Sequence, residues 1–385
     1  MTNTTEWITR SVSRLRSGAS STDKAPKASK PAADKQVADG AATKVPAPRS
    51  THERLQATLR RGNESLSPRA LRRLLADLQD VVAPQVSELE GGRRAQVVAG
   101  WYGQAEPEER RDMWLLLCEQ FAPDATRFQS ARQRYEAAAG TADEGQAEIS
   151  LRRALVSPRT RLMQRFAVFP EGMRFLVDLR AELLPQLKSD KRLVALDADL
   201  EHLFTTWFDV AFLELRRLSW DSPASLIEKL IKYEAVHDIR SWADLKNRLD
   251  SDRRCYGFFH PRLPNEPLIF VEVALVDRIS SSITPLLDEA AAPADLKKAT
   301  TAIFYSISNT QPGLRGVSFG DSLIKHVVET LTAEFPRLRT FATLSPIPGF
   351  RGWLGKNAGA MLARLDEKRR TELGRAVGAE PPQSA

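Results

Sequence analysis

The sequence has little cysteine and no long apolar run, and these two absences exclude several classes of protein. Its 385 residues include two cysteines, Cys118 and Cys255, which lie far apart and beside apolar neighbours. This usage excludes a disulfide framework and a CxxC metal site, and it fits a reducing cytosol. We therefore expect two buried thiols, a cytoplasmic location and no bound metal. No apolar run approaches the roughly 20 residues that a membrane-spanning helix needs, so we expect no membrane segment.

Signatures of nucleic-acid binding are also missing, although the chain is basic. The formal net charge is +7, from 56 lysine and arginine residues against 49 aspartate and glutamate residues. Such a balance is compatible with nucleic acid, a membrane surface or a polyanionic small ligand as partner. The sequence shows neither the aromatic pattern of RNA-binding domains nor zinc-finger spacing. We therefore expect mostly solvated surface charge and no nucleic-acid partner.

Two regions of different pattern lie between two ends of biased composition. Residues 1–50 are rich in Ala, Lys, Pro, Ser and Thr, and we expect them to be disordered because they offer little apolar surface to bury. From residue 51 to 217 apolar residues recur at helical spacing, which predicts an all-α bundle. Within it, Leu193–Leu218 is expected to form a long helix or a pair of helices. Residues 371–385 are expected to form a second disordered tail.

Residues 218–370 contain strand patterns and form the second predicted domain. Runs of β-branched and aromatic residues indicate strands at Cys255–Phe259 and Leu268–Val276, joined as an antiparallel hairpin by a turn at Pro264–Pro267. An amphipathic helix is expected between two further strands. The predicted fold class is therefore α+β, a helical bundle followed by a mixed sheet. The two further strands are Ala302–Ile307 and Thr340–Leu344.

A glycine-containing loop, residues 308–320, follows the third predicted strand. Gly313, Gly316 and Gly320 make this loop thin, and Ser318 adds a hydroxyl. Backbone N–H groups at a helix start lack intrahelical partners and lie at the positive end of the helix dipole, so a phosphate group can bind there. Glycine loops are common, and a plain connection between a strand and a helix accounts for the same spacing. The spacing alone leaves both interpretations open.

The fourth predicted strand runs directly into Ser345-Pro346-Ile347-Pro348. The two prolines fix φ and remove two backbone donors, which makes this corner rigid. Such a corner would hold the Ser345 hydroxyl at a strand end, where ligand sites of α/β folds lie. A proline-rich turn with a capping serine explains the same residues, so this spacing also leaves two interpretations open.

Several long motifs follow one another in the second domain. They are EAVHDIRSWADLKNRL at 234–249, RRCYGFFHPRLPNEPLIFVEVAL at 253–275, FYSISNTQPGLRGVSFG at 304–320, LIKHVV at 323–328 and LSPIPGF at 344–350. In these residues and in this order, the chain closely resembles the malonyl-CoA decarboxylase family. The resemblance runs at least from Trp220 to Leu354 and, more loosely, through the helical region before it. Several long motifs in one order are far more specific than a single glycine loop.

The resemblance implies a helical N-terminal domain, which mediates self-association in the family, and a catalytic domain similar to the GNAT acetyltransferases. It implies malonyl-CoA as the partner, a homo-oligomer formed through the helical domain, and no cofactor, because the CoA thioester is the substrate. The family's catalytic serine falls on Ser345. The family's loop for the CoA diphosphate falls on seven consecutive residues, Arg315, Gly316, Val317, Ser318, Phe319, Gly320 and Asp321.

The reaction that the resemblance implies is the decarboxylation of malonyl-CoA to acetyl-CoA. Loss of CO₂ leaves a thioester enolate, which needs preorganised hydrogen-bond donors and a proton at C2. A serine hydroxyl alone is a poor acid or base, so Ser345 needs a partner, ordinarily a histidine. In the family that histidine lies well downstream of the serine motif, beyond residue 385 of this chain. We therefore expect a decarboxylase or a C-terminally shortened version of one, and the shortened form should have weak or no turnover.

None of the histidines in the chain matches the one that the family uses. His260, in a turn, and His326, in mid-helix, are the two that we consider as substitutes. The alternative function is a non-catalytic acyl-CoA-binding or oligomer-scaffold protein built on the same two domains. The five histidines are His52, His202, His237, His260 and His326.

Overall fold

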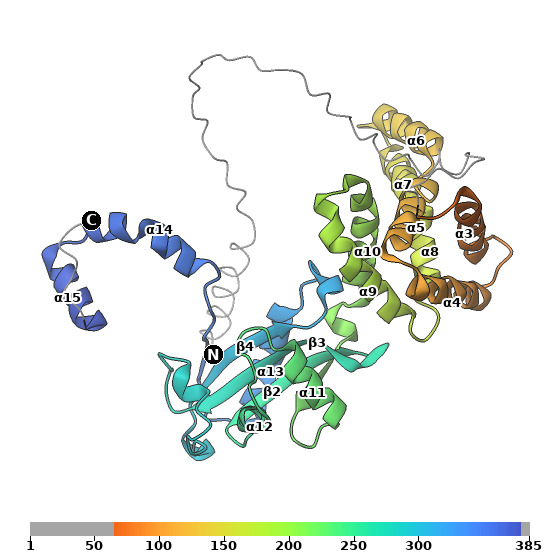
Figure 1. Ribbon diagram of the computed structural model, residues 1–385. Coiled ribbons are helices and arrows are strands. Elements are labelled where there is room, and N and C mark those ends of the chain that lie inside the picture. The colour runs from red at the N-terminus through yellow and green to blue at the C-terminus, as the bar shows by residue number, and fades with distance from the viewer. Residues whose placement is uncertain (1–64, 379–385) are drawn as a thin grey trace, which may run out of the picture.

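The computed structural model describes residues 65–378, which form a helical bundle and a sheet with covering helices (Figure 1). The predicted tail at residues 1–50, His52 and residues 379–385 lie outside the described part. The predicted α+β class is confirmed, with the bundle first along the chain. The bundle helices are α3 (Pro68–Val81), α4 (Glu88–Gln104), α5 (Pro107–Gln120), α6 (Ala125–Ala138), α7 (Glu144–Leu155), α8 (Pro158–Phe166), α9 (Gly172–Leu183) and α10 (Val194–Trp207).

In the described part of the chain, five strands form one sheet whose order follows the sequence. Neighbouring strands are antiparallel from β1 to β4, which confirms the predicted β2–β3 hairpin, and β5 lies parallel to β4. Parallel neighbours need a crossover connection, which α13 (Gly320–Glu334) supplies. The strands are β1 (Glu214–Leu218), β2 (Arg253–His260), β3 (Leu263–Val276), β4 (Thr301–Asn309) and β5 (Thr340–Thr343).

Helices cover both faces of this sheet. Successive side chains of a strand point to opposite faces, so β3 contributes to clusters on both faces of the sheet. Val271 packs in the cluster that contains the apolar side of α13. Phe270 packs in the cluster that contains α11 (Ala224–Tyr233) and α12 (Trp242–Arg248). The α13 face therefore forms a layer separate from the α11 and α12 face.

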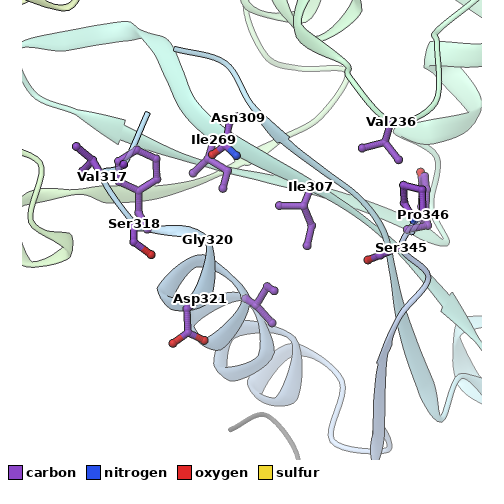
Figure 2. A pocket seen from close by; sticks show the side chains of 14 residues that line it. Val236, Ile269, Ile307, Asn309, Val317, Ser318, Gly320, Asp321, Ser345 and Pro346 are labelled. Atoms are coloured by element: carbon purple, nitrogen blue, oxygen red, sulfur yellow. The ribbon is translucent and has the colours of Figure 1, made fainter. Parts of the chain in front are cut away.

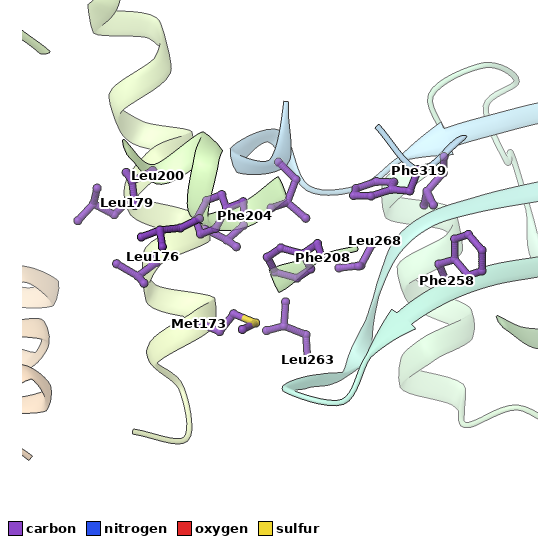
Figure 3. Packing of buried hydrophobic residues seen from close by; sticks show 14 of the residues in the cluster. Met173, Leu176, Leu179, Leu200, Phe204, Phe208, Phe258, Leu263, Leu268 and Phe319 are labelled. Atoms are coloured by element: carbon purple, nitrogen blue, oxygen red, sulfur yellow. The ribbon is translucent and has the colours of Figure 1, made fainter. Parts of the chain in front are cut away.

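The bundle and the sheet share one apolar core (Figure 3). Helices α9 and α10 contribute leucines and Phe204, and the core continues through Phe208 to the β2–β3 hairpin. Leu263 and Leu268 of β3 are both buried in it. Burial of apolar surface stabilises this contact by about 25 cal/mol per Å², so the two domains are packed as one unit. The residues labelled in Figure 3 are Met173, Leu176, Leu179, Leu200, Phe204, Phe208, Phe258, Leu263, Leu268 and Phe319.

Two of the predicted elements differ in the structure. The helix expected over Leu193–Leu218 ends at Trp207, and the same stretch finishes as strand β1, so the predicted domain boundary after residue 217 falls inside that strand. β1 forms because all five of its residues pair with β2, a tertiary contact that outweighs local helical preference. The turn expected at Pro264–Pro267 lies inside β3, where register shifts in the pairing with β2 accommodate prolines.

The predicted tail at residues 371–385 is also wrong in part, because α15 (Glu367–Val377) covers its first residues. This helix has strong local signals: Asp366 accepts a hydrogen bond from the Arg369 N–H at 2.8 Å, and Gly378 ends it in the left-handed conformation. Neither α15 nor α14 (Phe350–Ala363) contains a buried residue, and both extend away from the sheet (Figure 1). No helix between residues 65 and 378 is long and apolar enough to cross a bilayer.

Candidate active site

A cavity of about 500 Å³, called the main cavity below, lies between β4, the start of α13 and the segment after β5 (Figure 2). Ser318 and Asp321 lie at one end of it, Ser345 and Pro346 lie at the other, and Ile307 lies between (Figure 2). The volume is in the range of small-molecule sites. The lining residues are Val236, Ile269, Tyr305, Ile307, Asn309, Gly316, Val317, Ser318, Phe319, Gly320, Asp321, Ile324, Ser345 and Pro346.

The main cavity exists because β4 and β5 diverge. The two strands pair over four residues each, and the Leu344 N–H then donates to the Phe304 carbonyl at 2.9 Å. Beyond that bond they no longer pair. A register shift opposite Glu272 leaves Tyr305 as an extra residue in β4, and such a bulge bends its strand. The bend opens a gap that Ile307 lines on one side and Ser345 on the other.

At the opposite end, the first turn of α13 faces the main cavity. The helix starts at Gly320, and no side chain caps its N-terminal N–H groups. These groups lie at the positive end of the helix dipole, which is the arrangement expected for an anion site. Asp321 places a carboxylate there, and Lys325 offsets its charge through an ion pair at 3.1 Å. Phe319 is buried and anchors the loop to the core.

The structure brings together almost all of the predicted site residues. Six of the seven loop residues, Gly316 to Asp321, line the main cavity with Ser345. Arg315 does not line it. Arg315 instead borders an adjoining cavity of about 390 Å³, which shares Asn309, Gly316, Val317 and Phe319 with the main cavity. The predicted pairing of a glycine loop with a strand-end serine is therefore present as geometry.

The histidines of the described part all lie outside the lining of the main cavity. His326 is exposed on α13, where its ring contacts Phe258. His260 is buried, and its Nδ1 accepts a hydrogen bond from the Arg262 N–H at 3.1 Å. Burial lowers the pKa of His260, so its ring is neutral near pH 7. Neither of the two candidate substitutes for the family's histidine therefore reaches Ser345 as a lining residue.

Sequence reasoning missed a loop that closes the end of the main cavity near Ser345. Val236 lies beside Pro346 and Ser345 in Figure 2. The loop is held by Glu234, whose buried carboxylate accepts from the Ser306 hydroxyl at 2.7 Å and from the Ser308 hydroxyl at 3.2 Å. The same carboxylate accepts the Val236 N–H at 2.9 Å. Two serines alternating inside an apolar strand were the available sequence signal for a buried polar partner.

A second buried carboxyl group, Glu272, lies on β3 behind the loop. Its Oε2 accepts a hydrogen bond at 3.1 Å from Arg248, which also binds Asp244. Burial raises the pKa of Glu272 to about 8, the nearby Glu234 carboxylate adds to this rise, and Arg248 opposes it. Glu272 is therefore mostly protonated at neutral pH. Glu234 accepts a fourth hydrogen bond from the His237 N–H at 2.9 Å.

We expect Glu272→Gln to change how stability depends on pH. An unfolded glutamate ionises near pH 4.5, whereas the folded Glu272 keeps its proton up to about pH 8. Between these values the folded state holds more protons, so stability falls as pH rises, by up to about 1.4 kcal/mol per pH unit. The stability of the Gln variant lacks this slope. Its free energy of unfolding, relative to that of wild type, should therefore rise from pH 5 to pH 7.5. Urea unfolding at both pH values measures this, and parallel curves for the two proteins would contradict it.

Whether the described residues, 65–378, could bind a metal ion depends on clusters of ligating side chains. Among residues 65–378, no group of three or more His, Cys, Asp or Glu side chains is arranged to hold a metal ion. Cys255 is buried and Cys118 is half-buried, and both thiols are free. Burial raises the pKa of Cys118 to about 11, so neither its position nor its protonation favours a reactive thiolate.

Comparison with known proteins gives a consistent result over both domains. Residues 121–208 match the family model of the malonyl-CoA decarboxylase N-terminal domain, and residues 211–383 match that of the C-terminal domain. The crystal structure of malonyl-CoA decarboxylase from Rhodopseudomonas palustris is 42% identical with a TM-score of 0.68, and the match covers 79% of this chain and 73% of that one.

Mitochondrial malonyl-CoA decarboxylases are also similar to this chain. The protein from Anser anser anser is 42% identical over 228 residues, which are 57% of this chain and 45% of that protein. The protein from Mus musculus is 38% identical over 273 residues, 68% of this chain and 56% of that protein. The chain thus spans about half the length of these two relatives. With both family models matched and a solved structure covered over nearly three quarters of its length, the chain belongs to the malonyl-CoA decarboxylase family.

Proposed function

We propose that the chain is a carboxy-lyase that converts malonyl-CoA to acetyl-CoA and CO₂. One observation carries the proposal: a single cavity joins a helix N-terminus suited to phosphate with a hydroxyl on a rigid strand end. The two ends of a CoA thioester are its diphosphate and its acyl group, and these two protein groups are suited to bind one end each. The names of the similar proteins support the choice of malonyl as the acyl group.

In this proposal the CoA diphosphate binds main-chain N–H groups of Gly316–Asp321 other than that of Val317, which donates to the Leu314 carbonyl at 3.0 Å. The pantetheine chain then runs along the apolar wall that Ile269, Ile307 and Ile324 form in the main cavity. Its thioester would lie where β4 and β5 have parted. Within residues 65–378, main-chain groups on that side of β4 have no partner strand and can bind a ligand. The malonyl group would reach the Ser345 hydroxyl.

The chemistry breaks one carbon–carbon bond and forms one carbon–hydrogen bond. The bond between the malonyl carboxylate carbon and C2 breaks, CO₂ leaves, and its electron pair becomes the thioester enolate. Hydrogen bonds to the thioester oxygen stabilise this charge as it develops. C2 then takes one proton and gives acetyl-CoA. Ser345 would hydrogen-bond the malonyl group and pass a proton from a further donor to C2.

The second candidate function is binding of an acyl-CoA without turnover. The observation that favours it is the composition of the main cavity, whose described lining contains Tyr305, Asp321 and two serines but no histidine. Burial raises the pKa of Tyr305, so its phenol remains protonated at neutral pH. A proton for C2 would then have to come through water and Ser345.

We expect the purified protein to bind CoA and to release labelled CO₂ from malonyl-CoA that carries the label in its free carboxyl. Calorimetric titration with CoA measures the first property, and trapping of the label measures the second. Binding together with CO₂ release supports the decarboxylase. Binding with release no faster than in buffer supports the acyl-CoA-binding alternative. Absence of CoA binding would contradict both candidates.

We further propose that the protein self-associates through its helical domain and works in the cytoplasm. Val97 on α4 and Val156 after α7 are large apolar side chains that this domain leaves exposed. The family resemblance implies the subunit contact, and these two side chains are candidates to take part in it. The free thiols Cys118 and Cys255 support a reducing compartment. Light scattering of the purified protein measures the subunit number, and a monomer at micromolar concentration would contradict self-association.

A further inference from the structure

One face of α9 in the helical bundle contacts the loop that leads to α13. Arg174, Val177 and Arg180 are spaced three residues apart, so they share this face. Arg174 donates to the Gln311 side chain at 2.6 Å. Gly313 lies so close to Val177 that a Cβ on it would be 1.9 Å from the Val177 carbonyl oxygen. The loop is therefore packed on the bundle backbone to backbone.

Arg180 makes the central contact of this face, and its side chain is 1% exposed. Nε donates to Asp197 at 2.8 Å and Nη2 donates to Glu201 at 2.9 Å, one turn apart on α10. Nη1 donates to two carbonyls of the loop, those of Gly313 at 2.9 Å and Arg315 at 2.7 Å. One planar guanidinium thus joins α9, α10 and the loop, which a single ammonium could not do.

The loop enters the main cavity directly after these contacts. Gly316 has a φ of +93°, and a Cβ on it would be 2.8 Å from the Glu201 carboxylate that Arg180 binds. Gly316 itself lines the main cavity, followed by Val317 to Asp321. Arg180, which does not line the main cavity, therefore contacts the loop immediately before the proposed phosphate-binding amides.

We propose that Arg180 is a positioning residue that fixes the CoA loop from the helical domain; this role rests on the proposed binding of CoA in the main cavity. Without the guanidinium, the carbonyls of Gly313 and Arg315 lose their donor, and the loop gains conformations in which its amides do not converge. A ligand must then order the loop as it binds, which weakens affinity. Ser345 lies after β5, on the other side of the main cavity, so its chemistry should change much less.

The test compares Arg180→Met with Arg159→Met. Arg159 is an equally buried arginine of the bundle, bound to Asp199 at 2.8 Å and to the carbonyls of Leu117 and Cys118, away from the loop. Both variants lose a buried ion pair, so both should be less stable. Only Arg180→Met should bind CoA more weakly, by about tenfold in Kd measured by calorimetry. If turnover is present, KM should rise with little change in kcat.

Hydrogen exchange without ligand gives a second measurement that does not depend on CoA. Peptides covering residues 313–321 should exchange faster in Arg180→Met and at the wild-type rate in Arg159→Met. Where Arg180→Met does not fold, Arg180→Lys keeps the charge and should show the same changes at smaller size. Wild-type Kd and wild-type exchange in the Arg180 variants, or equal losses in Arg159→Met, would overturn the role of Arg180. Wild-type protein that fails to bind CoA would instead refute the proposed function.

Discussion

Ser345→Ala is expected to lower kcat for CO₂ release by at least about 100-fold, the usual size of a lost proton-transfer or oxyanion contact. The Kd for CoA should change less than about threefold. The reason is geometric: Ser345 lies at the end of the main cavity opposite the α13 N-terminus (Figure 2). The residue is exposed, so removing its Oγ leaves the hydrophobic core intact. Steady-state release of labelled CO₂ and calorimetry with CoA measure the two effects.

Ser318→Ala is the matched comparison for this result. It removes the same hydroxyl at the other end of the main cavity, from the loop before α13. A few-fold rise in KM is expected from it, with a much smaller change in kcat. Unaltered turnover in Ser345→Ala, or equal losses of kcat in the two variants, would contradict the assignment of Ser345.

Gly316→Val is expected to weaken CoA binding by about 30-fold, which corresponds to about 2 kcal/mol. A β-branched residue is strongly disfavoured at the φ of +93° found there, and its Cβ would approach the Glu201 carboxylate to 2.8 Å. The loop must therefore move away from the position in which its amides face the main cavity. Calorimetric titration with CoA measures the change.

Gly140→Val separates this effect from general backbone strain. Gly140 has a φ of +75° in the turn between α6 and α7, and a Cβ on it would meet no atom within 4 Å. It should destabilise the fold by a similar amount and leave the Kd for CoA unchanged. An unchanged Kd in Gly316→Val, or the same loss in Gly140→Val, would refute the assignment of the glycine loop.

The sequence was informative where local pattern and tertiary structure agree. The run Leu268–Val276 is buried on both sheet faces, so its apolar character, interrupted only by Glu272, indicated a strand correctly. Residues 214–218 carry two arginines and a glutamate at the edge of the sheet, and nothing in their spacing indicates a strand until β2 is present to pair with them. Local pattern therefore predicted central strands better than the edge strand.

In the candidate site too, some residues could be predicted from the sequence and others could not. The meeting of Ser345 with the glycine loop followed from the family resemblance of two motifs that lie close together in the sequence, whereas their spacing alone had left other interpretations open. The contact of Arg180 with Gly313 spans 133 residues of sequence. In the sequence, a buried arginine on an amphipathic helix cannot be told apart from a solvent-exposed one. Glu234 was missed for a similar reason, because its serine partners lie 72 and 74 residues further along the chain. Long-range hydrogen bonds between buried polar groups leave almost no trace in periodicity.

The core shared by bundle and sheet limits how evolution could have exchanged these two halves. The two family matches meet between residues 208 and 211, which makes that junction look like a natural point for recombination. Yet Phe208, at the junction, is buried, with its ring 5.0 Å from that of His260. Fusing the sheet half to a foreign neighbour would expose Leu263 and Leu268 to water or force them against an unmatched surface. A clean cut at this junction would therefore separate two halves that share their core.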